Sequence, residues 1–412
     1  MRIYSIIVAR EARIMIIKRA YLIVVDSLGI GAMPDCERYG DSKTVNTLKS
    51  LYKTGKLNVP NLQSLGLFNI EGVDYGEKAE QPLGSFARLT EASVGKDTTT
   101  GHWEIAGHIT KEPLPTYPDG FPPEVVEKLE AAFGSKILCN KPYSGTQVIM
   151  DYGKEHIETK SPIVYTSADS VLQIAAHEEV IPLDELYSMC QKSRSIMQGK
   201  HGVGRIIARP FVGEYPNYIR TTNRHDYSLE VPVDTIMDML KVVGQSVAAV
   251  GKIQDIFAGR GTTAYIPISS TADAMEKVLK RATEKHRGLC FINLVDFDMK
   301  YGHRRDADGY AIALNEFDEY LGKLMETIED EDTILITADH GCDPTATGTD
   351  HTREYVPFVI YGKGIKAGVD LGTRESMADI AATIADMLRS PMRTEGKSFW
   401  RQIKGYWDNI TI

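Results

Sequence analysis

The sequence is short of cysteine, of long apolar runs and of excess positive charge. Its five cysteines are scattered and odd in number, without the paired spacing of a zinc site, which fits a reducing compartment and predicts a cytoplasmic protein. No stretch is long and apolar enough to span a membrane. The net charge of -9 argues against general binding to nucleic acid or to anionic membranes. Any phosphate-binding basic residues must therefore form a local cluster.

The first residues of the chain form a weakly apolar segment. Residues 1–17 faintly resemble a signal peptide, but Arg10, Glu11 and Arg13 interrupt the apolar run and no cleavage-type segment follows. The run from Met15 to Arg19, directly before the first strand, looks like a natural protein start. We therefore expect residues 1–14 to be an extension with no role in the fold.

The composition is that of a globular protein with room for two domains. At 412 residues, with 42% hydrophobic and 25% charged residues, the chain can bury a sizeable core. Residues 21–25, 289–295 and 333–337 are short apolar runs, typical of strands that are covered on both faces. Such strands alternate with helical patterns, which predicts an α/β core with a central, mostly parallel sheet.

A change in the sequence pattern interrupts this core. Between about residues 111 and 230 prolines cluster and the strand–helix alternation gives way to mixed segments. The change predicts an inserted α+β cap domain at 111–230, while residues 15–110 and 231–412 form the core.

Acids stand at or near the ends of three predicted core strands. They are Asp26, Asp298 and Asp339. Open α/β sheets bind ligands beyond the carboxyl ends of their strands, so these side chains can converge there. Three imidazoles accompany them in the sequence: His303, His340 and His351. Such a set suits two divalent cations, although a strand-end Asp can also cap a helix and a His can be structural.

A hydroxyl-rich stretch supplies a candidate nucleophile. Lys96, Asp97 and Thr98 lie before a helix that we expect at 102–107. Free amides at a helix start favour a bound phosphate, whereas the simpler interpretation is an N-cap. A metal-bound hydroxyl can attack phosphorus at neutral pH, so Thr98 or a neighbour fits that role. Cys342 is either a soft ligand or a small packing residue.

Together these stretches resemble the alkaline phosphatase superfamily and, within it, the phosphopentomutase family. The resemblance runs in order from about residue 19 to the C-terminus. It rests on residues 25–31, 95–98, 101–104, 165–170, 223–226, 296–298, 302–306, 337–341 and 348–354.

The resemblance implies an alkaline-phosphatase-like core with a mobile cap, and two Mn²⁺ ions, with Mg²⁺ or another divalent cation also possible. One ion would be bound by Asp298, His303 and His351. The other would be bound by Asp26, Asp339, His340 and Thr98, and Thr98 would also carry the phosphoryl group.

The same resemblance implies an isomerase that interconverts ribose or deoxyribose 1-phosphate and the 5-phosphate, in nucleoside salvage. Ser167 and Asp169 would face the ribose, and Arg205, Arg220 and Lys252 would bind phosphate. A sugar bisphosphate such as glucose 1,6-bisphosphate would prime Thr98. The expected partners are small pentose phosphates, with no nucleic acid and no membrane. The oligomeric state is left open, and a monomer is compatible with the sequence.

Three alternatives have different consequences. A phosphatase or phosphodiesterase on the same core would release phosphate, but the inserted cap speaks against it. A phosphoglycerate mutase relative would be expected to use Ser where this chain has Thr98. A catalytically idle metal- or sugar-phosphate-binding protein would take up Mn²⁺ and ligand without turnover.

Overall fold

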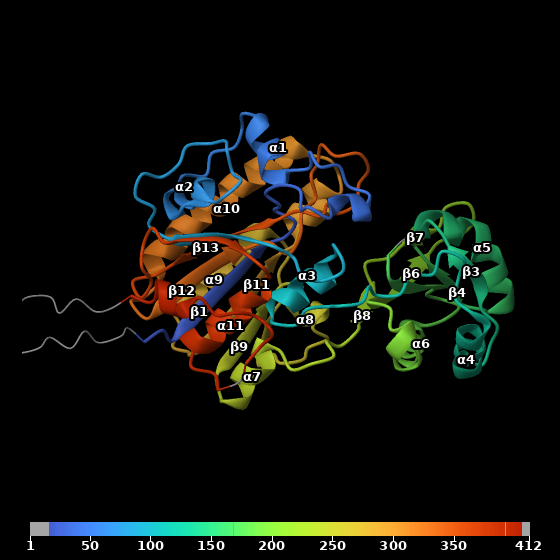
Figure 1. Ribbon diagram of the computed structural model, residues 1–412. Coiled ribbons are helices and arrows are strands. Elements are labelled where there is room, and N and C mark those ends of the chain that lie inside the picture. The colour runs from blue at the N-terminus through green and yellow to red at the C-terminus, as the bar shows by residue number, and fades with distance from the viewer. Residues whose placement is uncertain (1–15, 168, 392, 406–412) are drawn as a thin grey trace, which may run out of the picture. The chain divides into compact units, whose positions relative to one another are not determined.

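A computed structural model of the chain describes residues 16–167, 169–391 and 393–405. The chain divides into two units, drawn in Figure 1. Unit 1 comprises the described parts of Met1–Lys111, Val231–Gln254 and Arg260–Ile412, and unit 2 comprises those of Glu112–Glu230 and Asp255–Gly259. Unit 2 thus contains the segment 111–230 that we assign to an inserted domain, except for Lys111, together with a short piece of the later chain. The expected extension, residues 1–14, lies outside the described residues.

Unit 1 is built on a mixed sheet that is mostly parallel in its centre, as predicted. Within the described residues this sheet has eight strands in the order β10-β9-β11-β1-β12-β13-β2-β14. Only β13 runs antiparallel to its neighbours β12 and β2. In that order the strands are β10 Ala264–Ile266, β9 Ser246–Val250, β11 Gly288–Leu294, β1 Arg19–Val25, β12 Asp332–Thr337, β13 Val356–Tyr361, β2 Ser85–Leu89 and β14 Asp370–Arg374.

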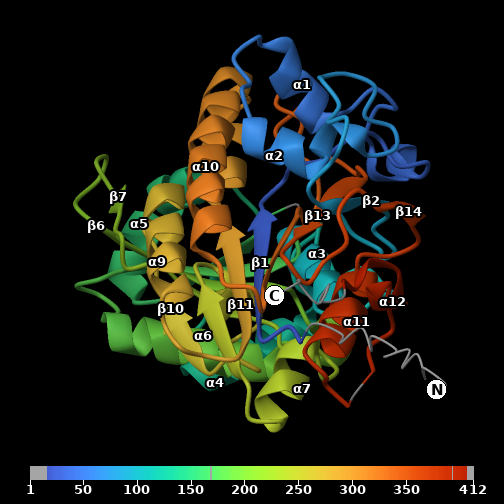
Figure 2. The ribbon, with the colours of Figure 1, turned by 90° about the vertical axis from the view of Figure 1, so that its left-hand side faces the viewer.

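Two layers of helices cover this sheet. Helices α9 and α10 lie on one face and α7 and α11 on the other, as Figure 2 shows. Every residue of β1, β11 and β12 is therefore buried, which explains their continuous apolar runs. No helix within the described residues is long and apolar enough to cross a membrane. The unit 1 helices are α1 Thr47–Lys53, α2 Pro60–Leu65, α3 Thr98–Ile105, α7 Ile236–Val242, α9 Thr271–Ala282, α10 Ala307–Thr327, α11 Ala378–Met387 and α12 Trp400–Ile403; α8, Ile253–Ile256, extends from unit 1 into unit 2.

Unit 2 has its own mixed sheet and its own core. Helices α4 and α6 cover one face, and α5 packs on the other around Tyr165 and Phe211. The strands follow the order β3-β4-β5-β6-β7, and β8 also pairs with β6. The elements are β3 Leu138–Pro142, β4 Ile163–Thr166, β5 Val171–His177, β6 Arg205–Val212, β7 Ile219–Arg220, β8 His225–Ser228, α4 Pro123–Phe133, α5 Gly145–Thr159 and α6 Leu183–Ile196.

A buried ion pair joins the first residues of β1 and β12. The guanidinium of Arg19 donates two hydrogen bonds of 2.5 Å to the Asp332 carboxylate. Arg19 also donates to the carbonyl oxygens of Ala282 and Glu284, at 3.0 and 2.7 Å. This pair therefore fixes the strands whose opposite ends carry Asp26 and Asp339.

Removal of the Asp332 carboxylate would take away the buried ion pair of Arg19 and leave it the two carbonyl oxygens and the exposed Glu329 carboxylate, 3.2 Å away. We expect Asp332→Ala to lower the free energy of unfolding by roughly 3–5 kcal/mol in denaturant titrations. The control is Glu331→Ala, which breaks the neighbouring exposed pair with Lys18 and should cost about 1 kcal/mol or less. Equal losses in both variants would contradict the role given to the buried pair.

Candidate metal centre and nucleophile

Three carboxylates converge at the carboxyl edge of the unit 1 sheet. Asp26 directly follows β1, Asp339 follows β12, and Asp298 lies in the π-helical turn Phe297–Gly302 after β11. Because β11, β1 and β12 are parallel neighbours, their carboxyl ends meet at one edge. Asp26 and Asp339 are 0% exposed and Asp298 is 4% exposed. The three acids thus share a volume that is nearly closed to bulk water.

The first predicted ligand group is compact. The Nε2 atoms of His303 and His351 lie 3.2 and 3.3 Å from the two carboxylate oxygens of Asp298, and 3.1 Å from each other. The Nδ1 atom of His303 lies 2.6 Å from the carbonyl oxygen of Thr349, which fixes the proton on Nδ1 in the neutral ring. The lone pair of Nε2 then points at the shared space, as metal binding requires.

The second predicted group lies beside the first. A short bridge between Gly341 and Thr352 brings the two histidine loops together, so that the His340 and His351 rings stack with centroids 3.9 Å apart. The Nε2 atom of His340 lies 3.6 Å from Asp26 Oδ1 and 3.3 Å from Asp339 Oδ2.

Asp298 connects the two groups. Ligand atoms of Asp26, Asp298 and His340 all lie within 4.8 Å of one another, as do those of Asp298, His303 and His351. Asp339 does not belong to the set of Asp26, Asp298 and His340, but its Oδ2 atom lies 3.3 Å from His340 Nε2. The structure therefore brings all the predicted carboxylate and imidazole ligands together, while the assignment of each to one cation stays a prediction.

The donor set fits a cation. Asp26 Oδ1, Asp298 Oδ1 and Asp339 Oδ2 are buried and accept no hydrogen bond from the described residues. An unpaired buried carboxylate oxygen is costly, and a divalent cation removes that cost. Burial, followed by the charges of Asp339 and Asp298, raises the pKa of Asp26 well above its ordinary value.

The histidine pKa values indicate what cation binding must change. Burial lowers the pKa of His340 to about 4, so this ring is neutral and ready to act as a ligand. The hydrogen bond to Asp298 raises the pKa of His303 to about 11. A cation that binds His303 must therefore displace a proton.

Thr98 stands at the start of α3, next to the second group. Its Oγ1 atom lies 3.3 Å from His340 Nε2. Asp97 caps the helix by accepting hydrogen bonds from the amides of Thr99 and Thr100. The expected helix at 102–107 was therefore placed too late, because the Asp97 cap starts the helix at Thr98. The cap and the candidate nucleophile are adjacent residues of one turn.

Lys96 and Cys342 have structural partners. Lys96 pairs with Asp41 at 3.2 Å and with Asp350 at 3.1 Å. Burial raises the pKa of the Cys342 thiol to about 11, and Cys342 is 1% exposed. Cys342 belongs to neither of the two candidate metal-holding groups among the described residues, which favours the packing role.

Glu354, which the sequence analysis did not single out, clamps the loops of the site. One carboxylate oxygen accepts from the amides of Gly31 and Thr47, at 3.0 and 2.9 Å. The other accepts from the hydroxyls of Thr47 and Thr352, at 2.8 and 2.7 Å. A Cβ atom on Gly29 would collide with this side chain, so glycine is required there. Glu354 thus ties the loop after Asp26 to the loop that carries His351.

The predicted substrate contacts fall in both units. In unit 2, the Asp169 amide lies 3.3 Å from Ser167 Oγ, Arg205 lies 3.7 Å from Asp226, and Arg220 Nε donates to Gly145 at 3.1 Å. Lys252 follows β9 in unit 1. Burial raises the pKa of Asp26, and the positive charge of Lys252 lowers it in part. These side chains are placed within their own units, and their contact with substrate stays a prediction.

Unit 2 also contains Arg209, an arginine to which the sequence analysis gave no role. Arg209 lies four residues after Arg205 on the same face of β6, and Phe211 on that face pairs in register with Arg220. Burial, and then the charges of Arg224 and Arg220, lowers the pKa of Arg209 to about 10. The four-residue spacing of Arg205 and Arg209, which places both on one face of a strand, was the signal that could have revealed Arg209.

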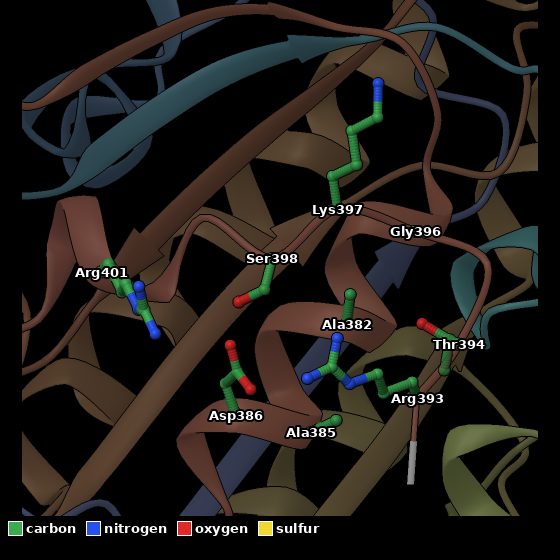
Figure 3. Close-up of a pocket in the computed structure, with 9 residues that line it drawn as sticks. All are labelled: Ala382, Ala385, Asp386, Arg393, Thr394, Gly396, Lys397, Ser398 and Arg401. Carbon is green, nitrogen blue, oxygen red and sulfur yellow. The ribbon is translucent and has the colours of Figure 1, made fainter.

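A separate pocket lies away from the predicted ligands. It has a volume of about 470 Å³ and is lined by α11 and residues 393–401, as Figure 3 shows. Arg393, Lys397 and Arg401 are among its lining residues, but none of the predicted site residues is. The site described above therefore rests on the convergence of strand ends and not on this cavity.

The chain is similar to known proteins over almost its whole length. A family model described as the metalloenzyme superfamily matches residues 18–392. Phosphopentomutase of Lachnoclostridium phytofermentans is 55% identical over 383 residues, which cover 93% of this chain and 98% of that protein. Phosphopentomutases of Clostridium novyi and Caldanaerobacter subterraneus subsp. tengcongensis are each 50% identical over 388 residues, which cover 94% of this chain and 99% and 98% of theirs.

The pKa of Glu354 predicts a pH dependence of stability. Burial raises this pKa from 4.5 to about 7, so the folded chain holds the proton more tightly than the unfolded chain does. The stabilising contribution is complete below pH 4.5 and is lost as the pH rises through about 7. In wild type, we expect the free energy of unfolding to fall by about 3 kcal/mol over that range because of Glu354. The variant Glu354→Gln should not show this fall when the metal-free proteins are unfolded in denaturant. Glu331→Gln, at an exposed carboxylate, is the control, and parallel pH curves for wild type and Glu354→Gln would refute the prediction.

Proposed function

The chain belongs to the phosphopentomutase family of the metalloenzyme superfamily and is an isomerase, and from this premise we propose how it works. It interconverts ribose 1-phosphate and ribose 5-phosphate, and the 2-deoxy pair, through a phosphorylated Thr98 and two divalent cations. Mn²⁺ is the proposed native cation, and a sugar bisphosphate such as glucose 1,6-bisphosphate primes Thr98. The proposed setting is nucleoside salvage in the cytoplasm.

The position of the Thr98 hydroxyl carries this proposal. Oγ1 lies 3.3 Å from His340 Nε2, beside carboxylates with buried, unpartnered oxygens. Thr99 and Thr100 are the alternatives, but the Thr100 hydroxyl bonds to Asp97. Among the described contacts of the three neighbouring threonines, the Thr98 hydroxyl is the one that lies within hydrogen-bond distance of a predicted ligand. A hydroxyl in that place suits nucleophilic attack on phosphorus.

The residues fit two cation positions. Asp298, His303 and His351 would hold one cation, and Asp26, Asp339, His340 and Thr98 would hold the other. Bound there, the cations would supply Lewis acidity to an in-line phosphoryl transfer.

Thr98 carries the phosphoryl group between two positions of one sugar. The bond from phosphorus to Thr98 Oγ1 breaks while phosphorus bonds to the free hydroxyl oxygen of a bound pentose monophosphate. The proton of that hydroxyl passes to Thr98 Oγ1, which returns as a hydroxyl. The resulting 1,5-bisphosphate turns, and its other phosphoryl group goes to Thr98 by the reverse exchange. The net result moves phosphate from one carbon to the other.

Unit 2 is the proposed cap. Ser167 and Asp169 contact the ribose, and Arg205, Arg220 and Lys252 bind the phosphate that is not being transferred, through charge-assisted hydrogen bonds. Exclusion of water from phosphorylated Thr98 separates a mutase from a phosphatase, because water competes with the sugar hydroxyl for the phosphoryl group.

A Thr98→Ala variant tests the phosphothreonine route. Purified protein receives ribose 1-phosphate, Mn²⁺ and a trace of glucose 1,6-bisphosphate, and ribose 5-phosphate and free phosphate are measured together. Wild type should form the isomer with little free phosphate, and Thr98→Ala should lose essentially all turnover because the acceptor oxygen is gone. The matched control, Thr99→Ala, should keep it. Release of phosphate without isomer would indicate a phosphatase, and turnover in Thr98→Ala would move the nucleophile to a neighbouring threonine.

Removal and return of the cation test whether turnover depends on bound divalent cations. Chelation should abolish turnover and lower the melting temperature, and Mn²⁺ should restore both. Since Mn²⁺ must displace the His303 proton, whose pKa is raised to about 11, binding should tighten on the order of tenfold per pH unit between about pH 6 and 8. Calorimetric titrations in several buffers would measure the released proton. An affinity independent of pH would count against the assigned His303 ligand.

A further inference from the structure

A polar residue interrupts the apolar strand β11 close to the site. Asn293 is 0% exposed and is paired in register with Val24 of β1. Its Nδ2 atom lies 2.7 Å from Asp26 Oδ2 and 3.2 Å from His102 Nε2. A buried amide in an apolar strand is costly unless its donors are used. Both donors of this amide are used, and both point at groups around the cation site.

The orientation of the Asn293 amide follows from these partners. Its Oδ1 atom is buried and accepts no hydrogen bond from the described residues. A flipped amide would place Oδ1 against the Asp26 carboxylate, oxygen against oxygen. The amide nitrogen therefore faces Asp26, and its second N–H donates to His102.

The bond from Asn293 sets the tautomer of His102. Nε2 of His102 accepts from Asn293, so the ring proton sits on Nδ1. That Nδ1 atom lies 2.9 Å from the carbonyl oxygen of Thr98 and 3.1 Å from Asp339 Oδ2. His102 is 0% exposed, and its ring stacks on Phe291 of the same strand as Asn293. The imidazole is thus locked with its N–H toward two site residues.

The helix that carries His102 packs directly on the Asp339 backbone. A Cβ atom on Gly101 would collide with the Asp339 carbonyl oxygen, so only glycine allows this approach. The close packing leaves the Thr98 turn and the Asp339 loop in one fixed relation. His102 lies at their junction.

We propose that Asn293 and His102 are positioning residues that link Asp26 to the Thr98 turn by one chain of hydrogen bonds and hold the Asp339 carboxylate in close contact with the His102 ring. The amide fixes one Asp26 oxygen and leaves Oδ1 open, while His102 aims the Asp339 carboxylate and holds the carbonyl of Thr98. The inference rests on the function proposed above, because both carboxylates belong to its second cation position. A chain of this kind orients ligands that come from two different strands.

Four variants separate this role from simple core packing. Asn293→Leu keeps the shape of the side chain but removes both donors. His102→Gln keeps a group able to accept from Asn293 but loses the donor at the Nδ1 position. His102→Asn keeps a donor at the Nδ1 position but loses the acceptor for Asn293. The matched control is His156→Gln in unit 2, because His156 is also 0% exposed and uses both ring nitrogens, toward Ser161 and the His177 amide.

The experiment titrates each metal-free protein with Mn²⁺ by calorimetry, and measures kcat, KM for ribose 1-phosphate and the metal-free melting temperature. In Asn293→Leu and His102→Gln we expect one Mn²⁺ site to weaken about 10–100-fold while the other is unchanged. We also expect kcat to fall with little change in KM. His102→Asn should lose less Mn²⁺ affinity than His102→Gln, and His156→Gln should bind Mn²⁺ as wild type does.

Two results would overturn the proposal. One is wild-type Mn²⁺ affinity at both sites in Asn293→Leu and His102→Gln. The other is an equal loss at both sites together with a lower metal-free melting temperature, which would mean that these residues only support the core. Wild type that binds Mn²⁺ but forms no ribose 5-phosphate would instead refute the proposed function, and the affinity comparison would still decide the roles of Asn293 and His102.

Discussion

Repulsion among three buried carboxylates is the constraint on which the rest of the site depends. Asp26, Asp298 and Asp339 come from three neighbouring strands and share one closed volume. The nearby imidazoles offset part of this charge: burial would raise the pKa of Asp298, yet His351 and His303 bring it well below its ordinary value. Oxygens on all three acids still accept no hydrogen bond from the described residues. Holding these acids together therefore lowers the stability of the fold, and a cation bound among them would offset that cost.

Hydrogen bonding separates the acids that build the site from those that would act in it. Glu354 accepts from four donors, and Glu104 accepts from the amides of Ala92, Ser93 and Met377 and from the Ser376 hydroxyl. These carboxylates have no oxygen to spare and serve as anchors for loops. The acids at the strand ends each keep an open oxygen. That contrast separates the candidate ligands from Glu354 and Glu104 without reference to any relative.

The sequence predicted the parts of the site that have a local pattern. Asp26 and Asp339 follow strongly apolar runs, so the strands and the acids at their ends could be found together. The start of α3 was missed because the first three residues after the Asp97 cap are threonines, whose helical propensity is weak. Glu354, Asn293 and His102 were given no role because each acts through partners far away in the chain, as in the bond of Asn293 to Asp26. A lone polar residue in an apolar strand shows that a partner is needed but not which one.

On the proposed function, local charges within each unit suit one of the two tasks that a sugar bisphosphate imposes. The acids of unit 1 suit cations, which stabilise the charge of a phosphoryl group in transfer. The arginines on the unit 2 sheet, around Arg209 and Arg220, suit a phosphate that is held in place, because the guanidinium fork matches the geometry of phosphate oxygens. A phosphatase needs only the first chemistry. On the proposed function, each phosphate of the 1,5-bisphosphate must take both roles in turn, so a mutase needs both chemistries in one chain.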